Sequence, residues 1–326
     1  PDSGLVGQAS FDYMIADGLG GTGTATFEVN VSLETDVITN VEKLVFDNNT
    51  ITVTNYLSGA VKLTGEDSQD VINFSGPTGV TIDGMGGDDI LRGGSGSDIF
   101  DGGTGNDYID GGAGLDDISG GLGDDTIDGG ADDDVITAGE GDDTVYGSAG
   151  EDTISGDAGD DYIDGGADDD LISGGLGDDH VVGGSGDDTI TGGEGQDVVE
   201  FLGSMANFTV AAAANGTLTI TDTTTMEGTD VVSGVERLRF SDGELSVDTG
   251  EDGYVTLSDA LGENDDVVTI VGPQAVTLEG FAGDDILTGG DGADIIDGGL
   301  GDDTIDGGSG DDTITAGEGD DTVYGS

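Results

Sequence analysis

The chain has 326 residues and is strongly acidic, because 72 Asp and Glu stand against 5 Lys and Arg and give a formal net charge of −67. So few basic residues exclude nucleic acid as a partner, since phosphate binding needs clustered Lys and Arg, and no apolar run is long enough for a membrane span. The absence of Cys excludes disulfides and thiolate chemistry. A compact fold with this charge would repel itself unless a counter-charge neutralised it.

The first predicted element is a β-hairpin within residues 1–33. The run SFDYMIADGLGGTGTATFEVNVS, at 10–32, has strand patterns on either side of an Asp-Gly turn signal and alternates with period two in its second half. It resembles the C-terminal hairpin of a bacterial cadherin-like or immunoglobulin-like domain. Residues 34–83 continue with short strand patterns, and we expect a β flank that leads into the next element.

Residues 84–200 divide without a gap into 13 nonapeptides, such as GGLGDDTID at 120–128. The sixth position is Asp in every repeat, the eighth is always Leu, Ile, Val or Phe, and the first and fourth are usually Gly. A fixed short period of this kind indicates a coiled repeat architecture.

The C-terminal part of the chain duplicates the N-terminal part. TDVITNVEKLVF at 35–46 returns as TDVVSGVERLRF at 229–240, and a second, truncated nonapeptide array fills residues 280–326. We expect residues 201–247 to form a β cap and spacer, because the open end of an array exposes unpaired backbone and apolar side chains. Residues 248–279 should form a second β flank. The chain is expected to be a fragment of a longer protein.

The chemistry of the repeat favours a divalent cation. A Gly-rich acidic tract cannot bury enough apolar surface to offset its ordering entropy, so the arrays should be disordered without a ligand. Ca²⁺ takes about six to eight oxygens from carboxylates and carbonyls, and glycines let the loop turn its carbonyls inward. The last three residues of each repeat should form a short strand with the eighth side chain buried, and two repeats should make one coil.

The nonapeptides resemble the G-G-x-G-x-D-x-U-x motif of the RTX (repeats-in-toxin) family. This resemblance implies an all-β fold in which two Ca-loaded parallel β-rolls alternate with small antiparallel β flanking or capping segments. It also implies several Ca²⁺ ions per roll, export by type I secretion, and folding only outside the cell.

By the same resemblance, the sixth-position aspartates would supply the carboxylate ligands of the metal sites. They are Asp89, Asp98, Asp107, Asp116, Asp125, Asp134, Asp143, Asp152, Asp161, Asp170, Asp179, Asp188, Asp197, Asp285, Asp294, Asp303, Asp312 and Asp321. Backbone carbonyls of loop residues would complete each site, among them those of Gly93, Gly94, Gly96, Gly102, Gly103, Gly105, Gly120, Gly121, Gly123, Gly298, Gly299 and Gly301.

Several repeats depart from the motif. Asp132 and Asp168 replace the fourth Gly, Ala138 and Ala316 replace the first, and Met85 and Phe281 replace the second. Asp tolerates a left-handed backbone better than most residues, so we expect an irregular cation geometry at Asp132 and Asp168. The repeats of Met85 and Phe281 open their arrays, where we expect a site that lacks a partner loop.

The sequence offers no catalytic constellation, and we expect a chain that is not an enzyme. It has no HExxH zinc motif and no GxSxG elbow. Its one His, His180, falls at a seventh position, which should face outward. The paired acids recur in too many copies to be catalytic carboxylates.

Two functions remain open. The first is a calcium-binding structural segment of a large secreted extracellular protein, of adhesin, filament or surface-layer type, that folds and stiffens on Ca²⁺ binding after type I secretion. Its partners would be calcium ions and either further copies of itself or a cell-surface or polysaccharide target. The alternative is the C-terminal secretion and folding module of an RTX toxin or secreted hydrolase. A second array after a full flank favours the first function.

Overall fold

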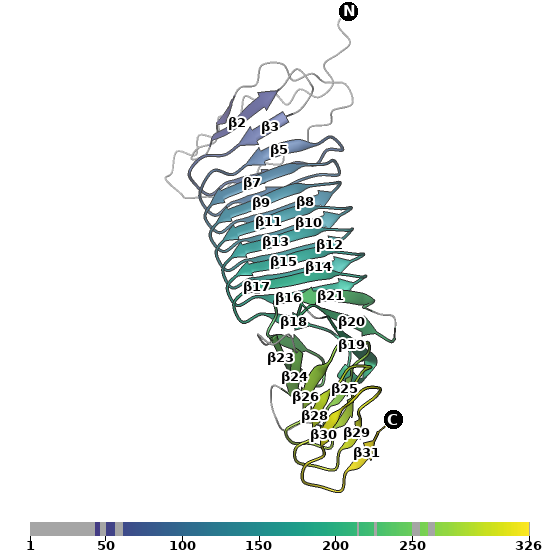
Figure 1. Cartoon of the computed structure of the whole chain (residues 1–326). Helices are drawn as coiled ribbons and strands as arrows, with labels where there is room; N and C mark the ends of the chain where they lie inside the picture. Colours follow the sequence, from purple (N-terminus) through teal and green to yellow (C-terminus); the bar gives the residue numbers. More distant parts are fainter. Residues whose placement is uncertain are drawn as a thin grey trace, which may run out of the picture.

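The computed structural model describes residues 43–45, 50–55, 61–213, 215–224, 227–249, 255–259 and 265–325. In these parts of the chain the fold is all-β and elongated, with strands stacked as the coils of a parallel β-roll (Figure 1). The predicted hairpin of residues 1–33 and most of residues 34–60 lie outside the described residues. None of the described segments contains a helix that is long and apolar enough to cross a membrane.

Two long sheets form the opposite walls of the roll. The first sheet has the order β1-β2-β3-β5-β7-β9-β11-β13-β15-β17-β21-β20-β19. Its strands are β1 (Lys43–Val45), β2 (Thr50–Asn55), β3 (Val61–Thr64), β5 (Val80–Asp83), β7 (Ile99–Thr104), β9 (Asp117–Leu122), β11 (Val135–Glu140), β13 (Thr153–Ala158), β15 (Leu171–Leu176), β17 (Thr189–Glu194), β19 (Phe208–Ala212), β20 (Leu218–Asp222) and β21 (Thr229–Ser233).

The second sheet forms the other wall and has the order β4-β6-β8-β10-β12-β14-β16-β18-β22-β23-β24-β26-β28-β30. Its strands are β4 (Val71–Asn73), β6 (Ile90–Arg92), β8 (Tyr108–Ala113), β10 (Thr126–Ala131), β12 (Thr144–Ala149), β14 (Tyr162–Ala167), β16 (His180–Ser185), β18 (Val198–Glu200), β22 (Arg237–Arg239), β23 (Glu244–Thr249), β24 (Val255–Asp259), β26 (Val276–Glu279), β28 (Ile295–Asp297) and β30 (Thr313–Thr315).

A third, smaller sheet belongs to the second array and has the order β25-β27-β29-β31. Its strands are β25 (Val267–Thr269), β27 (Ile286–Thr288), β29 (Thr304–Asp306) and β31 (Thr322–Tyr324). A single turn of 3₁₀ helix, η1 (Met205–Asn207), precedes β19.

One coil contains two nonapeptides, as the sequence predicts. Each strand of the array pairs in parallel with the strand 18 residues further on, so Ile127 of β10 lies beside Ile109 of β8 and Val145 of β12. The second array keeps the same register, with Ile305 beside Leu287. Successive repeats therefore contribute to opposite walls.

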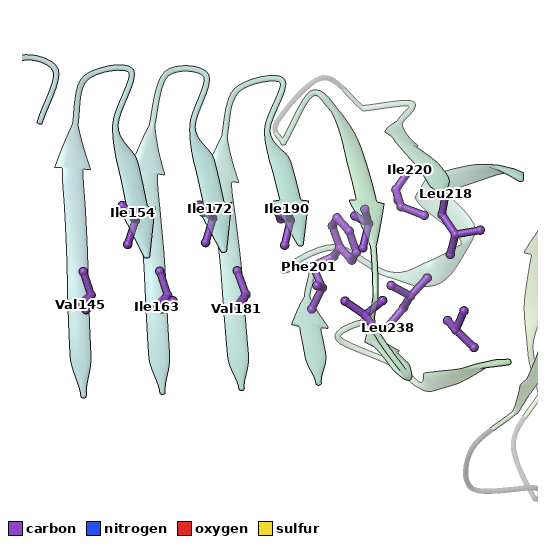
Figure 2. Packing of buried hydrophobic residues seen from close by; sticks show 14 of the residues in the cluster. Val145, Ile154, Ile163, Ile172, Val181, Ile190, Phe201, Leu218, Ile220 and Leu238 are labelled. Carbon is purple, nitrogen blue, oxygen red and sulfur yellow. The ribbon is translucent and has the colours of Figure 1, made fainter. Parts of the chain in front are cut away.

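Eighth-position side chains fill the space between the walls. From Leu91 to Val199 each of them is at most 2% exposed, and Figure 2 shows residues such as Ile154 and Ile163 between the strands. Burying each such side chain contributes about 1.5–3 kcal/mol. In the last described coil, Val323 is 47% exposed because no further described coil covers it.

Strands of the first array are longer than the three residues predicted. Strands β7 to β17 have six residues and run from the seventh position of one repeat to the third position of the next. The added half pairs as well, since Gly130 lies beside Gly112 and Ser148 in the neighbouring coils. In the second array, β27 to β31 keep the predicted three residues.

Strands between the two arrays join them into one body. β19, β20 and β22 lie within residues 201–247, where we expected a β cap and spacer. β23 pairs antiparallel with both β22 and β24, and β24 pairs in parallel with β26. The second sheet therefore continues from the first roll into the second. Phe201, Phe208 and Phe240 cluster at this junction with ring centroids 5.2 to 5.4 Å apart, and Figure 2 shows Phe201 near Leu238.

Candidate metal centre

Nonapeptide loops other than those of repeats 93–101 and 289–297 turn at their second and fourth positions, where the backbone has positive φ. Gly121 and Gly123, for example, have φ of 118° and 120°, a region that glycine enters at no steric cost. Where the motif is broken the turn persists, because Asp132, Asp168 and Met85 have φ of 75°, 79° and 73°. The loop shape is therefore kept in the irregular repeats, at some cost in backbone strain.

The turn buries the sixth-position carboxylates in two columns, one along each edge of the roll. Those that are at most 3% exposed are Asp89, Asp98, Asp107, Asp116, Asp125, Asp134, Asp143, Asp152, Asp161, Asp170, Asp179, Asp188, Asp197, Asp285, Asp294 and Asp303. Asp312 and Asp321, in the last coils, are partly exposed.

One oxygen of each carboxylate is engaged by the fold itself. Oδ1 of Asp143 accepts the backbone N–H of Asp125 at 2.7 Å, and Oδ1 of Asp125 accepts that of Asp107 at 2.7 Å. The same bond links consecutive coils along both columns of the first array and within the second. Each carboxylate is therefore held in a fixed orientation by the preceding coil.

The other oxygen, Oδ2, is buried and accepts no hydrogen bond in most of the repeats that the structure describes. These repeats carry Asp89, Asp107, Asp116, Asp125, Asp134, Asp143, Asp152, Asp161, Asp170, Asp179, Asp188, Asp197 and Asp303. Buried charged oxygens without a partner are costly and rare in native proteins. A row of them fits a row of bound cations.

A carbonyl oxygen of the following coil lies beside most of these Oδ2 atoms. A Cβ added to Gly120 would come 2.5 Å from both Oδ2 of Asp125 and the carbonyl oxygen of Ala138. The same two kinds of oxygen converge beside the first-position glycines Gly84, Gly93, Gly102, Gly111, Gly129, Gly147, Gly156, Gly165, Gly174, Gly280, Gly289 and Gly298. The first position is thus Gly because a side chain would fill the space between the oxygens. We call this space the oxygen cradle.

The predicted carbonyl ligands fall into separate environments. The first-position carbonyls of Gly102, Gly120 and Gly298 lie in the cradles of the coils before them. The second-position carbonyl of Gly94 instead accepts the N–H of Ala113 at 3.1 Å, and that of Gly299 accepts the N–H of Glu318 at 2.8 Å.

Fourth-position carbonyls form a third group. Those of Gly105, Gly123 and Gly301 face the fourth-position glycine of the following coil. The first-position oxygens are therefore the ones that meet the carboxylates.

The loop that contributes the first carboxylate of a column can differ from the later loops of the same column. Oδ2 of Asp98 accepts the N–H of Gly94 at 2.9 Å, and Oδ2 of Asp294 accepts that of Gly290 at 3.0 Å. Asp70, ahead of the first array, binds the N–H of Glu66 in the same way at 2.8 Å. Because these carboxylates close onto their own loops, they are less suited to a cation. The sequence predicted no such difference for Asp98 or Asp294.

Fifth-position acids face solvent and form a separate ladder that the sequence reasoning missed. Oδ1 of Asp124 accepts the N–H of Asp142 at 3.1 Å, and Oδ1 of Asp142 accepts that of Asp160 at 3.0 Å. This ladder runs in the direction opposite to the buried one. The two acids of an Asp-Asp pair therefore have different roles, since the outer one fastens adjacent loops and the inner one faces the cradle.

Burial raises the pKa of the sixth-position carboxyls of the first array. The pKa values of Asp125, Asp134 and Asp170 rise from 3.8 to about 7, mainly through burial; the hydrogen bond from the preceding coil lowers them, and neighbouring carboxylates raise them further. At neutral pH these columns therefore need protons or a cation to offset their charge.

Two acids outside the nonapeptides extend the columns, and the sequence reasoning missed both. Oδ1 of Asp230 accepts the N–H of Asp188 at 3.0 Å, and Oε2 of Glu236 accepts that of Asp197 at 2.9 Å. The strands that follow them, β21 and β22, pair in parallel with β17 and β18. The sequence does contain a signal for Asp230. Asp230, Val231 and Val232 match the acidic sixth position, the variable seventh position and the apolar eighth position of a repeat.

A family model described as the RTX calcium-binding nonapeptide repeat matches residues 83–118, 110–145, 137–172, 146–181, 173–201, 279–314 and 297–326. Together these segments cover residues 83–201 and 279–326, slightly more than half of the chain. The chain belongs to this RTX family. Its periodic loops, buried carboxylates and parallel coils agree with that assignment.

Comparison with solved structures gives weaker similarities to the RTX chain. A hyperactive, Ca²⁺-dependent, β-helical antifreeze protein from an Antarctic bacterium is 17% identical with a TM-score of 0.25, over 78% of this chain and 83% of that one. The extracellular lipase LipA from Serratia marcescens is 20% identical with a TM-score of 0.20, over 62% of this chain and 29% of the lipase. A comparison with curated proteins finds no match.

The RTX roll presents His180 on the outer surface of the second sheet, at the outward-facing position that the sequence predicts. Its Nε2 lies 2.9 Å from Oε2 of Glu200, and its ring meets the edge of Tyr162 with centroids 5.3 Å apart. These contacts link neighbouring coils on the surface.

Proposed function

We propose that this RTX segment is a calcium-binding structural element of a large secreted extracellular protein, of adhesin, filament or surface-layer type, that folds and stiffens after type I secretion. The observation that supports the proposal is the row of buried Oδ2 atoms without hydrogen-bond partners, most of which, such as that of Asp125, lie beside a carbonyl oxygen of the next coil. A hard cation is the group that oxygens of both kinds would share.

The sixth-position aspartates would act as the charged ligands. Each holds its Oδ1 on the amide of the preceding coil, so its Oδ2 cannot rotate away from the cradle. The first-position carbonyl of the following coil adds a second oxygen. Bound Ca²⁺ would supply the positive charge that the columns lack. Because the ligands come from different coils, every site would fasten one coil to the next.

Such sites suit a structural role better than a catalytic one, since their donors are turned toward the interior of the stack. The partners would be calcium ions, together with further copies of the chain or a cell-surface or polysaccharide target. Before export, at low calcium, the acidic columns would remain unneutralised and the chain unfolded. At the cell exterior, the same columns would fill and make the roll rigid.

A calcium titration followed by far-UV circular dichroism tests the proposal. We expect a cooperative change from coil to β signal at roughly 0.1 to 1 mM Ca²⁺, the range of extracellular modules. Mg²⁺, which keeps its water shell and prefers a strict octahedral site, should not produce it. A complete β signal in chelator would overturn calcium-coupled folding.

A further inference from the structure

The first array ends at Glu200, yet the stack continues for one more coil, which is formed by residues 228–239. We call these residues the closing coil. Gly228 has φ of 85°, as fourth-position glycines do, and the N–H of Thr229 donates to Oδ1 of Asp187 at 2.8 Å, as in the fifth-position ladder. Val232 and Leu238 are fully buried in the eighth-position columns. The closing coil therefore reproduces the contacts of the fourth, fifth and eighth positions of a nonapeptide with other residues.

The closing coil also supplies an oxygen to the last cradle of the array. Asp197 is fully buried, and its Oδ2 has no hydrogen-bond partner among the described residues. A Cβ added to Gly192 would lie 2.6 Å from this Oδ2 and would also meet the carbonyl oxygen of Gly234.

In the other cradles the carbonyl belongs to the residue 18 positions after the first-position glycine, as Ala138 follows Gly120. Gly234, in contrast, lies beyond the array. The N–H of Gly193 donates to the Gly234 carbonyl at 3.0 Å, which fixes this oxygen in place.

We propose that Asp197 and the Gly234 carbonyl form a divalent-cation site that fastens the closing coil to the last nonapeptide. This inference rests on the proposed function, because it assigns the Gly234 carbonyl, which lies outside the array, as the second ligand of the site at Asp197. A carboxylate and a carbonyl oxygen are both donors that Ca²⁺ accepts. Unlike the other cradles, this one takes its two ligands from segments with different sequences.

The location of this site gives it a consequence for the second roll. β22 of the closing coil pairs with β23, which pairs with β24, which pairs with β26 of the second roll. A cation at Asp197 would therefore order the first strand of this connection. Filling of the first array would prepare the edge on which the second array assembles.

Hydrogen–deuterium exchange of the whole chain during a calcium titration tests the inference. The variant is Asp197→Asn, which keeps the shape of the side chain and removes its charge. Its matched control is Asp125→Asn, which makes the same change in the same column four coils away. In both variants we measure the calcium concentration at which each peptide reaches half of its full protection from hydrogen–deuterium exchange. Native mass spectrometry counts the bound ions.

We expect both variants to lose one ion. Only Asp197→Asn should raise the calcium concentration that half-protects residues 228–239, by about tenfold or more, as for other losses around a metal. If the calcium concentration that half-protects residues 228–239 is the same in both variants, the proposed site is wrong.

Protection of the array by calcium without protection of residues 228–239 in the unaltered chain would also refute it. If array peptides themselves do not respond to calcium, the proposed function fails instead.

Discussion

The first-position glycine and the sixth-position aspartate of a repeat border the same small space, and each limits what the other can be. Asp125 brings a charged oxygen to the cradle, and Gly120 leaves the room for it. Repeat seven differs, since Ala138 occupies the first position and its side chain is fully buried. The methyl group of Ala138 therefore points into the interior where other repeats leave space.

This difference predicts opposite effects for two reciprocal substitutions. Gly120→Ala places a methyl group 2.5 Å from both cradle oxygens, so we expect the loss of one bound ion and of about 1–3 kcal/mol of stability by overpacking. Ala138→Gly should tighten the site of Asp143, against a backbone cost of about 0.5–1 kcal/mol. Native mass spectrometry and calcium-dependent melting measure both effects. An unchanged ion count in Gly120→Ala would contradict the cradle.

The raised pKa values of the buried carboxyls predict an unusual pH dependence for the metal-free roll. Carboxyls such as Asp125 and Asp170 have a pKa of about 7 when folded, against the ordinary 3.8. The folded state then binds more protons than the unfolded state between these values, so stability falls as pH rises through this window.

In chelator we therefore expect more β signal at about pH 5 than at about pH 8, measured by circular dichroism. Calcium should reverse the order, because its ligands must be deprotonated. A double variant, Asp125→Asn with Asp170→Asn, should weaken the dependence of the β signal on pH in chelator. A β signal that grows with pH in chelator would refute the assignment.

At the scale of elements, the sequence predicts what repeats and misses what differs between neighbouring coils. The two-nonapeptide coil and the buried eighth position were predictable, because every repeat meets the same environment. The closed loop at Asp98 was not, because its own nonapeptide, 93–101, keeps the glycines and the aspartate of the motif, and only the coil before it differs, with Val80 where later coils carry an aspartate. Gly234 was hidden for another reason, because a carbonyl ligand leaves no mark in the side-chain pattern.

At the scale of the whole molecule, the two rolls share one sheet and one core instead of being joined by a free linker. The second sheet passes through β22, β23, β24 and β26 without a break in strand pairing, and the buried cluster extends from Ile72 to Ile305. Figure 1 shows the second array continuing from the far end of the first roll. Order in one roll should therefore support order in the other, beyond the nearest-neighbour coupling of a simple repeat stack.

Truncating the aromatic cluster at the junction tests this coupling. Phe240 is 4% exposed, and its ring stacks on Phe201 with centroids 5.4 Å apart, so Phe240→Ala should cost about 3–5 kcal/mol locally. In saturating calcium, we expect hydrogen exchange to stay slow in the first array and to accelerate in residues 265–325. Phe100→Ala, an equally buried change in the first roll, should leave the second array protected. If Phe240→Ala also leaves residues 265–325 protected, the two rolls are stable independently and the shared sheet transmits no order between them.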